Sequence, residues 1–302
     1  MHNYSQQVAV VMSTYNGSDY LEQQIESIFA QEGVEFGIFV RDDGSQDNTL
    51  EVLESLAKRA EVPFVIERGT NCGVTESFFR AVGLVPKHYP FIALCDQDDI
   101  WHPDKLARAL HELGKLDQNK PLLYCSEYNF CDEHMRRTGK SALNRIGITP
   151  SRMLYENVCS GNTMVINRRL AHLAIGDGVE GVYCHDWWLA LVASHFGKVV
   201  FDDVPCLEYR RTGSNASPTG ANAVRLLAFR IRTFLAQGEF GRINQQNSTF
   251  LSRYYHLLDP SQRRVLSAFT HGPTLLKTTY PRRLRQKMHE ELALRLLLLL
   301  GY

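Results

Sequence analysis

The sequence predicts an α/β protein whose central sheet is mostly parallel and flanked by helices. Short continuous apolar runs alternate with segments of helical periodicity through the first two thirds of the chain, which is typical of buried parallel strands joined by crossover helices. Polar clusters follow three of these runs, at 13–17, 41–47 and 95–99. Ligands bind beyond the carboxyl ends of such strands, so we expect a site there.

The elements follow one another in a regular order. Residues 8–15 indicate a buried strand, and a helix begins at about Ser18, with Leu21, Ile25 and Ile28 at helical spacing on one face. The next expected strands are 36–45, 63–69 and 90–99, and the next expected helices are 47–60, 75–85 and one from Pro103.

After Cys125 the pattern is looser, and we expect a loop-rich region in which 182–197 opens a helix. A last strand is predicted at 198–210, and a polar loop follows it. From about residue 221 the pattern is helical and more basic.

Composition excludes several classes of protein. The 33 Lys and Arg residues balance 33 Asp and Glu residues, which argues against a nucleic-acid binder held by counterion release. Seven cysteines without a CxxC pair argue against a disulfide framework and a structural zinc site, and favour a reducing cytoplasm. We see no signal peptide and no apolar stretch of about 20 residues that would span a bilayer.

The stretch FIALCDQDDIWHP places Asp96, Asp98 and Asp99 directly after a buried strand. Like charges this close repel one another unless they are solvated or share a cation. The alternative is a solvated turn that caps the helix from Pro103. The first strand is followed by STYNGSDY rather than GxGxxG, and no GxxxxGK[ST] loop occurs, so a dinucleotide or P-loop site is excluded.

Three motifs, STYNG, RDDGSQD and DQDD, resemble the donor-binding half of a family 2 glycosyltransferase with the GT-A fold. The resemblance continues through NCGVTESFFRA, CSGNTM and CHDWWLALVA and covers roughly residues 8–215. The forms DQDDIW, SGNTM, HDWW and YRRTGSN resemble bacterial rhamnosyltransferase-like members. The resemblance implies a GT-A catalytic domain over 1–215 and a helical C-terminal extension over 216–302.

A nucleoside-diphosphate sugar donor is implied by this resemblance. Thr14 and Tyr15 can bond and pack the base, although ordinary strand-end packing is the alternative. Asp42 and Asp43 can accept hydrogen bonds from the base or the ribose, and the sequence does not decide between them. Gly44 permits the tight turn. The remaining residues that we assign to donor binding are Asn16, Asn71, Gly73, Asp96 and Arg210.

By the same resemblance Asp98 is the expected ligand of Mg²⁺ or Mn²⁺, with Asp96 as a second ligand or nearer the ribose. Asp99 supports either residue or caps the next helix. Related enzymes often carry a histidine in a motif resembling YRxHGxN, and here that position is Thr212. Arg210 and Arg211 can hold the diphosphate instead.

An inverting transfer needs a base, and Asp186 in HDWW occupies the matching position, with Trp187 and Trp188 as a dry wall. The alternative is that Asp186 only caps a helix. His185 is the competing base because its ordinary pKa is near neutrality.

Near the C-terminus, basic residues precede the apolar tail HEELALRLLLLLGY; they are Arg282, Arg283, Arg285 and Lys287. This segment could lie on an anionic membrane surface as a peripheral contact, or its leucines could pack on the catalytic domain or in a homodimer. We favour packing.

Together these features predict a cytoplasmic, metal-dependent inverting glycosyltransferase. The expected donor is dTDP-L-rhamnose and the expected acceptor is a glycan or lipid-linked oligosaccharide in bacterial surface polysaccharide synthesis, such as O-antigen or capsule. Two alternatives stay open: the same enzyme with a UDP-hexose donor, and a catalytically weak nucleotide-binding scaffold protein.

Overall fold

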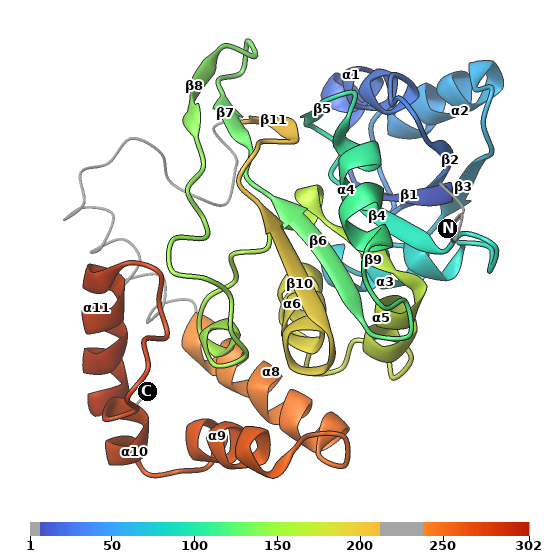
Figure 1. Cartoon of the computed structure of the whole chain (residues 1–302). Coiled ribbons are helices and arrows are strands. Elements are labelled where there is room, and N and C mark those ends of the chain that lie inside the picture. Colours follow the sequence, from blue (N-terminus) through green and yellow to red (C-terminus); the bar gives the residue numbers. More distant parts are fainter. Residues whose placement is uncertain (1–6, 212–237, 302) are drawn as a thin grey trace. The chain divides into compact units, whose positions relative to one another are not determined.

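The computed structural model describes residues 7–211 and 238–301 (Figure 1). The chain divides into two compact units. The first comprises Met1–Ala142, Cys159–Val179 and Cys184–Thr212, and the second comprises Leu143–Val158, Glu180–Tyr183 and Gly213–Tyr302. The predicted domain boundary at residue 215 lies outside the described residues.

The first unit is built on a seven-stranded sheet with the order β10-β6-β9-β4-β1-β2-β3. The pairs β1/β2, β1/β4, β2/β3 and β6/β10 are parallel, and β9 is antiparallel to both of its neighbours. The α/β prediction with a mostly parallel sheet is therefore confirmed. The strands are β1 (Gln7–Thr14), β2 (Glu35–Asp42), β3 (Phe64–Arg68), β4 (Phe91–Cys95), β6 (Leu122–Ser126), β9 (Val165–Asn167) and β10 (Lys198–Asp202).

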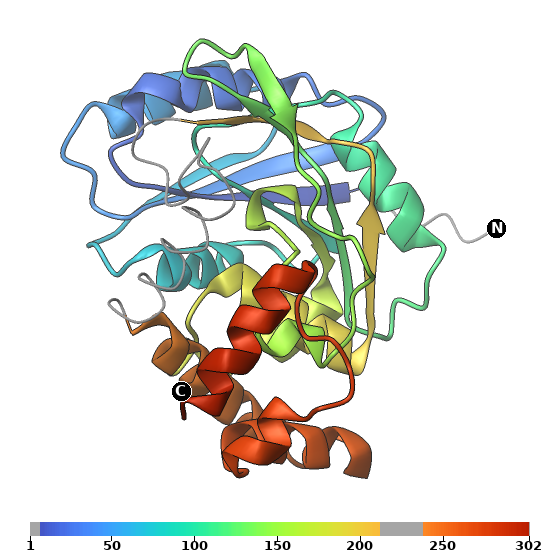
Figure 2. The same cartoon turned by 90° about the vertical axis from the view of Figure 1, so that its left-hand side faces the viewer.

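Helices cover both faces of this sheet (Figure 2). On one face, Val8, Val10 and Met12 of β1 join a buried cluster with apolar residues of three helices, and the intervening Ala9 and Val11 are also fully buried. Burial on both faces explains why β1 is a continuous apolar run. The cluster contains α1 (Ser18–Phe29), α2 (Thr49–Arg59) and α4 (Lys105–Gly114), whereas α3 (Val74–Gly83), α5 (Arg168–Ile175) and α6 (His185–Phe196) pack elsewhere on the sheet and on one another.

The parallel register brings three strand ends to one edge. Thr14 at the end of β1 pairs with Asp42 at the end of β2, and Met12 pairs with Cys95 at the end of β4. The motifs after β1, β2 and β4 therefore meet, although up to about eighty residues of chain separate them.

A second, four-stranded sheet has the order β5-β11-β7-β8. The predicted single strand 198–210 is two strands, since β10 lies in the large sheet and β11 in the small one. The chain turns between them at Pro205, which cannot donate a ladder hydrogen bond, and the side chain of Asp202 accepts from the Val204 N–H. The strands are β5 (Ile100–Trp101), β7 (Asn129–Cys131), β8 (Arg137–Lys140) and β11 (Leu207–Arg210).

The second unit is helical, as predicted for the C-terminal region. Asp259 and Gln262 form a reciprocal capping box at the start of α9. Within the described residues, every helix is too short or too polar to cross a membrane. The helices are α8 (Glu239–Tyr254), α9 (Pro260–Thr270), α10 (Thr274–Thr278) and α11 (Met288–Leu299), and short 3-10 turns lie at Arg152–Leu154 and, in the first unit, at Gly161–Thr163.

Candidate active site

A pocket of about 370 Å³ opens where the carboxyl ends of β1, β2 and β4 meet. Six of the predicted site residues line it: Tyr15, Asp43, Asn71, Gly73, Asp96 and Asp98. Four further lining residues were not predicted: Ser13, Val74, Phe78 and Gln97. The pocket therefore gathers motifs that the sequence places far apart.

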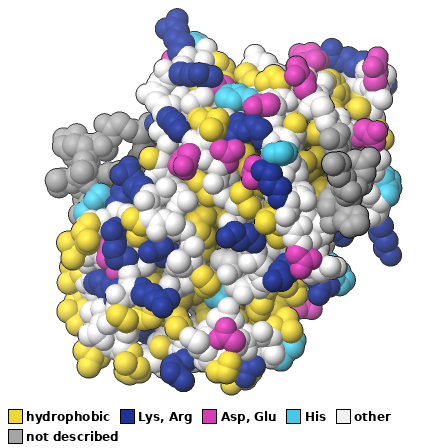
Figure 3. Space-filling view, in the orientation of Figure 1, with side chains coloured by type: hydrophobic (Ala, Val, Ile, Leu, Met, Phe, Trp, Pro, Cys, Tyr) yellow, Lys and Arg dark blue, Asp and Glu magenta, His cyan; other side chains and the backbone are white. Residues whose placement is uncertain are grey.

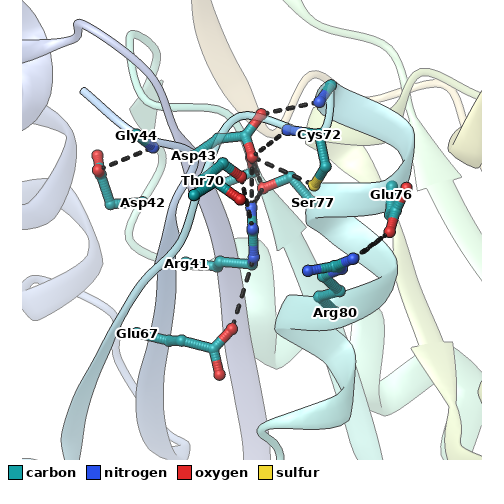
Figure 4. Close-up of polar contacts among 12 residues, drawn as sticks. Arg41, Asp42, Asp43, Gly44, Glu67, Thr70, Cys72, Glu76, Ser77 and Arg80 are labelled. Atoms are coloured by element: carbon teal, nitrogen blue, oxygen red, sulfur yellow. Dashed lines mark hydrogen bonds and ion pairs between the residues drawn. The ribbon is translucent and has the colours of Figure 1, made fainter. Parts of the chain in front are cut away.

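Asp43 is held in the pocket wall by the buried guanidinium of Arg41 (Figure 4). The Arg41 Nη1 lies 2.5 Å from the Asp43 Oδ1, and the backbone N–H groups of Cys72 and Gly73 donate to the same carboxylate at 2.9 and 3.0 Å. Arg41 also donates to Ser77 Oγ at 2.9 Å and to the Thr70 carbonyl at 3.0 Å. Burial raises the pKa of Asp43, but these hydrogen bonds outweigh it and lower the pKa below its usual value.

Asp42 and Thr14 are not among the residues that line the pocket. Asp42 is buried and accepts hydrogen bonds from the Thr14 hydroxyl and from the backbone of Gly44 and Ser45 at 2.9 to 3.2 Å. Gly44 has a φ of 84°, a conformation that favours glycine. Asp42 thus closes the turn after β2, and Asp43 alone of the two carboxylates lines the pocket.

Tyr15 and Gln97 form a reciprocal pair across the pocket edge. The Tyr15 N–H donates to Gln97 Oε1 at 2.9 Å, and Gln97 Nε2 donates to the Tyr15 carbonyl at 3.2 Å. Tyr15 itself is 46% exposed, and a Cβ on Gly17 would collide with Gln97. Asn16 has a φ of 48° and accepts from the next loop at Gln46 N, so it shapes the turn without lining the pocket.

Asp96 and Asp98 are half-buried in the pocket wall. Burial, and then the charges of Asp98 and Asp186, raise the pKa of Asp96 to about 7, and burial also raises the pKa of Asp98. Asp99 is fully buried and accepts from Asn162 Nδ2 at 2.6 Å. The third carboxylate therefore joins the DQDD turn to the SGNTM motif instead of lining the pocket.

Asp186 lies in the first turn of α6, close enough to Asp96 for its charge to act on that residue. Its Oδ1 accepts from the Trp187 N–H at 2.6 Å and the Cys184 thiol at 2.8 Å, whereas its Oδ2 accepts only a longer hydrogen bond, 3.3 Å, from Gly161 N among the described residues. Asp186 is not itself a lining residue. Among the described residues, Oδ2 is thus the oxygen with fewer and longer hydrogen bonds.

His185 is stacked on Phe78, a pocket residue, with ring centroids 4.2 Å apart and an angle of 22°. It is buried, and neither ring nitrogen has a hydrogen-bond partner within residues 7–211 and 238–301. Burial lowers the pKa of His185, so the ring is neutral at physiological pH. Its place is that of a packing residue behind the pocket wall.

Arg210 is buried and donates to Gln23 Oε1 at 2.6 Å and to the carbonyls of Asp98 and Glu133 at 3.1 Å. The guanidinium thus supports the backbone under Asp98 and is not a lining residue. Thr212 lies outside the described residues.

Within the described part of the chain, no three His, Cys, Asp or Glu side chains converge as a metal-binding group. Asp96 and Asp98 nevertheless fit a hard divalent cation, since both are pocket-lining oxygen donors whose charges repel one another. Mg²⁺ is commonly bound by one or two carboxylates, with water and phosphate oxygens completing its shell. Tyr15 gives the pocket an aromatic side chain, Asp43 a buried carboxylate, and Asp96 with Asp98 an acidic end. These three features match the base, the ribose and the metal-bound diphosphate of a nucleotide.

Comparison with curated proteins finds similarity to glycosyltransferases. The dTDP-rhamnosyl transferase RfbG of Shigella flexneri is 36% identical over 104 residues, which are 33% of this chain and 35% of that relative. The match thus spans about a third of that protein's length. Two of the solved structures that resemble the fold are described next.

The first is TarS of S. aureus in complex with UDP-GlcNAc, with a TM-score of 0.58 and 17% identity over 94% of this chain and 77% of TarS. The second is the mannosyltransferase PcManGT of Pyrobaculum calidifontis in complex with GDP-Man and Mn²⁺, with a TM-score of 0.51 and 16% identity over 99% of this chain and 88% of that one. Residues 9–172, just over half of the chain, match the family described as Glycosyl transferase family 2. The chain therefore belongs to glycosyl transferase family 2.

Proposed function

We propose that the protein is an inverting, metal-dependent glycosyltransferase that moves L-rhamnose from dTDP-L-rhamnose to a glycan or lipid-linked acceptor in bacterial surface polysaccharide synthesis. One observation carries the proposal: Tyr15, Asp43 and the Asp96–Asp98 pair line one pocket, and the charge of Asp186 reaches Asp96. Family membership and the rhamnosyl transferase relative support the reaction class and the donor.

The donor would bind along the pocket. Tyr15 offers an exposed ring for the base, and Asp43 accepts hydrogen bonds from the base or the ribose. Asn71 and Gly73 line the same pocket. Asp96 and Asp98 would hold Mg²⁺ or Mn²⁺, which when bound neutralises charge on the departing diphosphate. The manganese in the PcManGT structure agrees with this choice of cofactor.

The transfer would be a single displacement. Asp186 Oδ2 accepts the proton of the acceptor hydroxyl, whose oxygen forms a bond to the anomeric carbon. The bond from that carbon to the phosphate oxygen breaks on the opposite face, and its electron pair leaves with the nucleoside diphosphate. The Trp187 N–H and the Cys184 thiol hold Oδ1, so the carboxylate is oriented for Oδ2 to act.

A UDP-sugar donor is the second candidate, because the structure of TarS contains UDP-GlcNAc. We propose the cytoplasm as the place of action because an odd number of cysteines without a CxxC pair favours a reducing compartment.

A donor screen tests the proposal. The full chain is incubated with dTDP-L-rhamnose and with UDP-glucose, UDP-galactose and UDP-GlcNAc, each with Mn²⁺, Mg²⁺ or chelator, and release of the nucleoside diphosphate is measured. We expect metal-dependent release from dTDP-L-rhamnose and little from the UDP-sugars. The reverse preference would favour the second donor, and nucleotide binding without turnover on any donor would favour a scaffold protein.

A further inference from the structure

Helix α11 carries a row of exposed apolar side chains. Met288, Leu292, Leu296 and Leu299 are each more than half exposed, and their spacing of three or four residues puts them on one side of the helix. Leu300, the C-cap residue, is 65% exposed. Leu275 and Leu276 on the neighbouring α10 are 67% and 55% exposed. We call these seven residues the leucine face. Exposed apolar patches of this kind mark sites of contact with a partner or a membrane.

The acidic residues of α11 lie on its other side. Glu291 accepts from the backbone N–H groups of Leu284 and Arg285, both at 2.8 Å, and from Arg295 Nε at 2.7 Å. Glu290 pairs with Arg285 at 3.1 Å. Both carboxylates are buried and matched by arginines, so the leucine face carries no negative charge of its own.

The surrounding chain is strongly basic. Residues 238–301 contain ten Lys and Arg against four Asp and Glu, a formal net charge of +6, although the whole chain has a net charge of zero. Arg282 is exposed, and Lys287 stands at the start of α11. Figure 3 shows hydrophobic side chains gathered over α10 and α11, with Lys and Arg side chains among them. The leucine face is thus an apolar surface in a cationic setting.

We propose that the leucine face binds the surface of an anionic lipid bilayer, with α11 lying in the plane of the headgroups. An amphipathic helix with an apolar row and basic neighbours combines the two attractions that such surfaces provide. A second copy would present the same net charge of +6, and the two surfaces would repel one another. With 12 residues α11 is about 18 Å long, too short to span the bilayer.

The inference goes beyond the proposed function, because binding to lipid requires neither donor nor turnover. A protein held at this surface would meet acceptors that are themselves anchored in lipid. A failed donor screen would therefore leave the membrane proposal intact. A failure to bind vesicles would likewise leave the proposed glycosyl transfer intact.

Vesicle sedimentation of the full chain tests the proposal. Vesicles of phosphatidylcholine with phosphatidylglycerol are compared with vesicles of phosphatidylcholine alone. We expect binding to the anionic vesicles that falls when salt rises from about 0.1 M to about 1 M, since the screening length falls from about 10 Å to about 3 Å. The double substitution Leu292→Gln with Leu296→Gln should weaken binding about tenfold or more for each leucine.

Two further variants separate the contributions. Arg282→Gln should weaken binding to anionic vesicles about fivefold, as expected for one cation at a charged surface. Leu257→Gln is the matched control, because Leu257 is a 49% exposed leucine outside the leucine face. It should bind as the wild type does. Circular dichroism checks that each variant is folded.

Three results would overturn the proposal. The first is wild-type protein that stays in solution with anionic vesicles. The second is equal binding by the wild type and the Leu292→Gln, Leu296→Gln variant. The third is a dimer in light scattering that this variant dissociates while vesicles bind neither protein, which would assign the leucine face to a second copy.

Discussion

The buried pair formed by Arg41 and Asp43 gives a prediction that depends on no assumption about substrate. The two side chains are 1% and 4% exposed, and their closest nitrogen and oxygen atoms are 2.5 Å apart. In Arg41→Met the Asp43 carboxylate would stay buried with only the hydrogen bonds from Cys72 and Gly73. Removing one partner of a buried ion pair costs about 3–5 kcal/mol. We expect the free energy of unfolding to fall by that amount at pH 7.

The loss should depend on pH in a defined direction. In the wild type the pKa of Asp43 is lowered from 3.8, so its favourable contribution is present above pH 3.8 and is lost as the pH falls through the lowered value. Without Arg41, burial is less opposed and Asp43 protonates more readily. The difference in stability between wild type and variant should therefore be largest near neutrality and should narrow in acid.

Urea unfolding measures both effects. Arg59→Met is the control, because Arg59 is 50% exposed and pairs with surface glutamates, and it should cost no more than about 1 kcal/mol. A cycle with Asp43→Asn should show coupling, since the second substitution costs less once Arg41 is gone. The reasoning is refuted if Arg41→Met costs no more than Arg59→Met, or if the two substitutions at positions 41 and 43 are additive.

Three other predictions concern the chemistry and the acid sensitivity of the fold. Asp186→Asn should lower turnover by about 10²–10⁴-fold in steady-state kinetics while leaving nucleotide affinity in calorimetry unchanged. His185→Phe should retain turnover. If His185→Phe loses turnover and Asp186→Asn keeps it, His185 is the base. Asp98→Asn should remove the gain in nucleotide affinity that Mn²⁺ provides and leave affinity in chelator unchanged; calorimetry that finds the gain intact would exclude Asp98 as a ligand. Burial raises the pKa of Glu208, but hydrogen bonds from Arg137 and other neighbours outweigh burial and lower the pKa to about 2. The stability that the ionised Glu208 contributes is therefore present above pH 4.5 and is lost as the pH falls toward 2. Glu208→Gln should therefore cost about 1–3 kcal/mol at pH 7 and little at pH 2 in urea unfolding; an equal cost at both values would contradict this assignment.

Much of the fold could be predicted because its signals are local. The strands predicted at 8–15, 36–45 and 63–69 correspond to β1, β2 and β3, and the prediction for β2 runs three residues too far at its C-terminal end. Each segment contains an apolar run followed by polar turn residues. By contrast, β9 has only three residues, and its place between β4 and β6 depends on pairing with strands about 40 and 70 residues earlier in the chain. No periodicity exists in a segment that short.

The site could be predicted in outline only. The motifs identify the pocket, but the difference between Asp42 and Asp43 depends on the turn at Gly44 and on a buried arginine. A signal for that arginine does exist, since Arg41 interrupts an apolar strand directly before two carboxylates. The bond between Asp99 and Asn162 joins residues 63 positions apart, and no short-range pattern contains such a contact.

The two hydrogen bonds between the Tyr15 backbone and the Gln97 side chain make the two ends of the pocket mechanically dependent. Gln97 stands between Asp96 and Asp98, so any shift that draws these carboxylates toward a ligand also displaces the backbone of Tyr15. A base stacked on Tyr15 and a diphosphate bound at the turn of Asp96 and Asp98 would then make the same short segments of chain more rigid. Each occupant lowers the entropy that the other must lose on arrival, and a whole nucleotide is favoured over its separate halves.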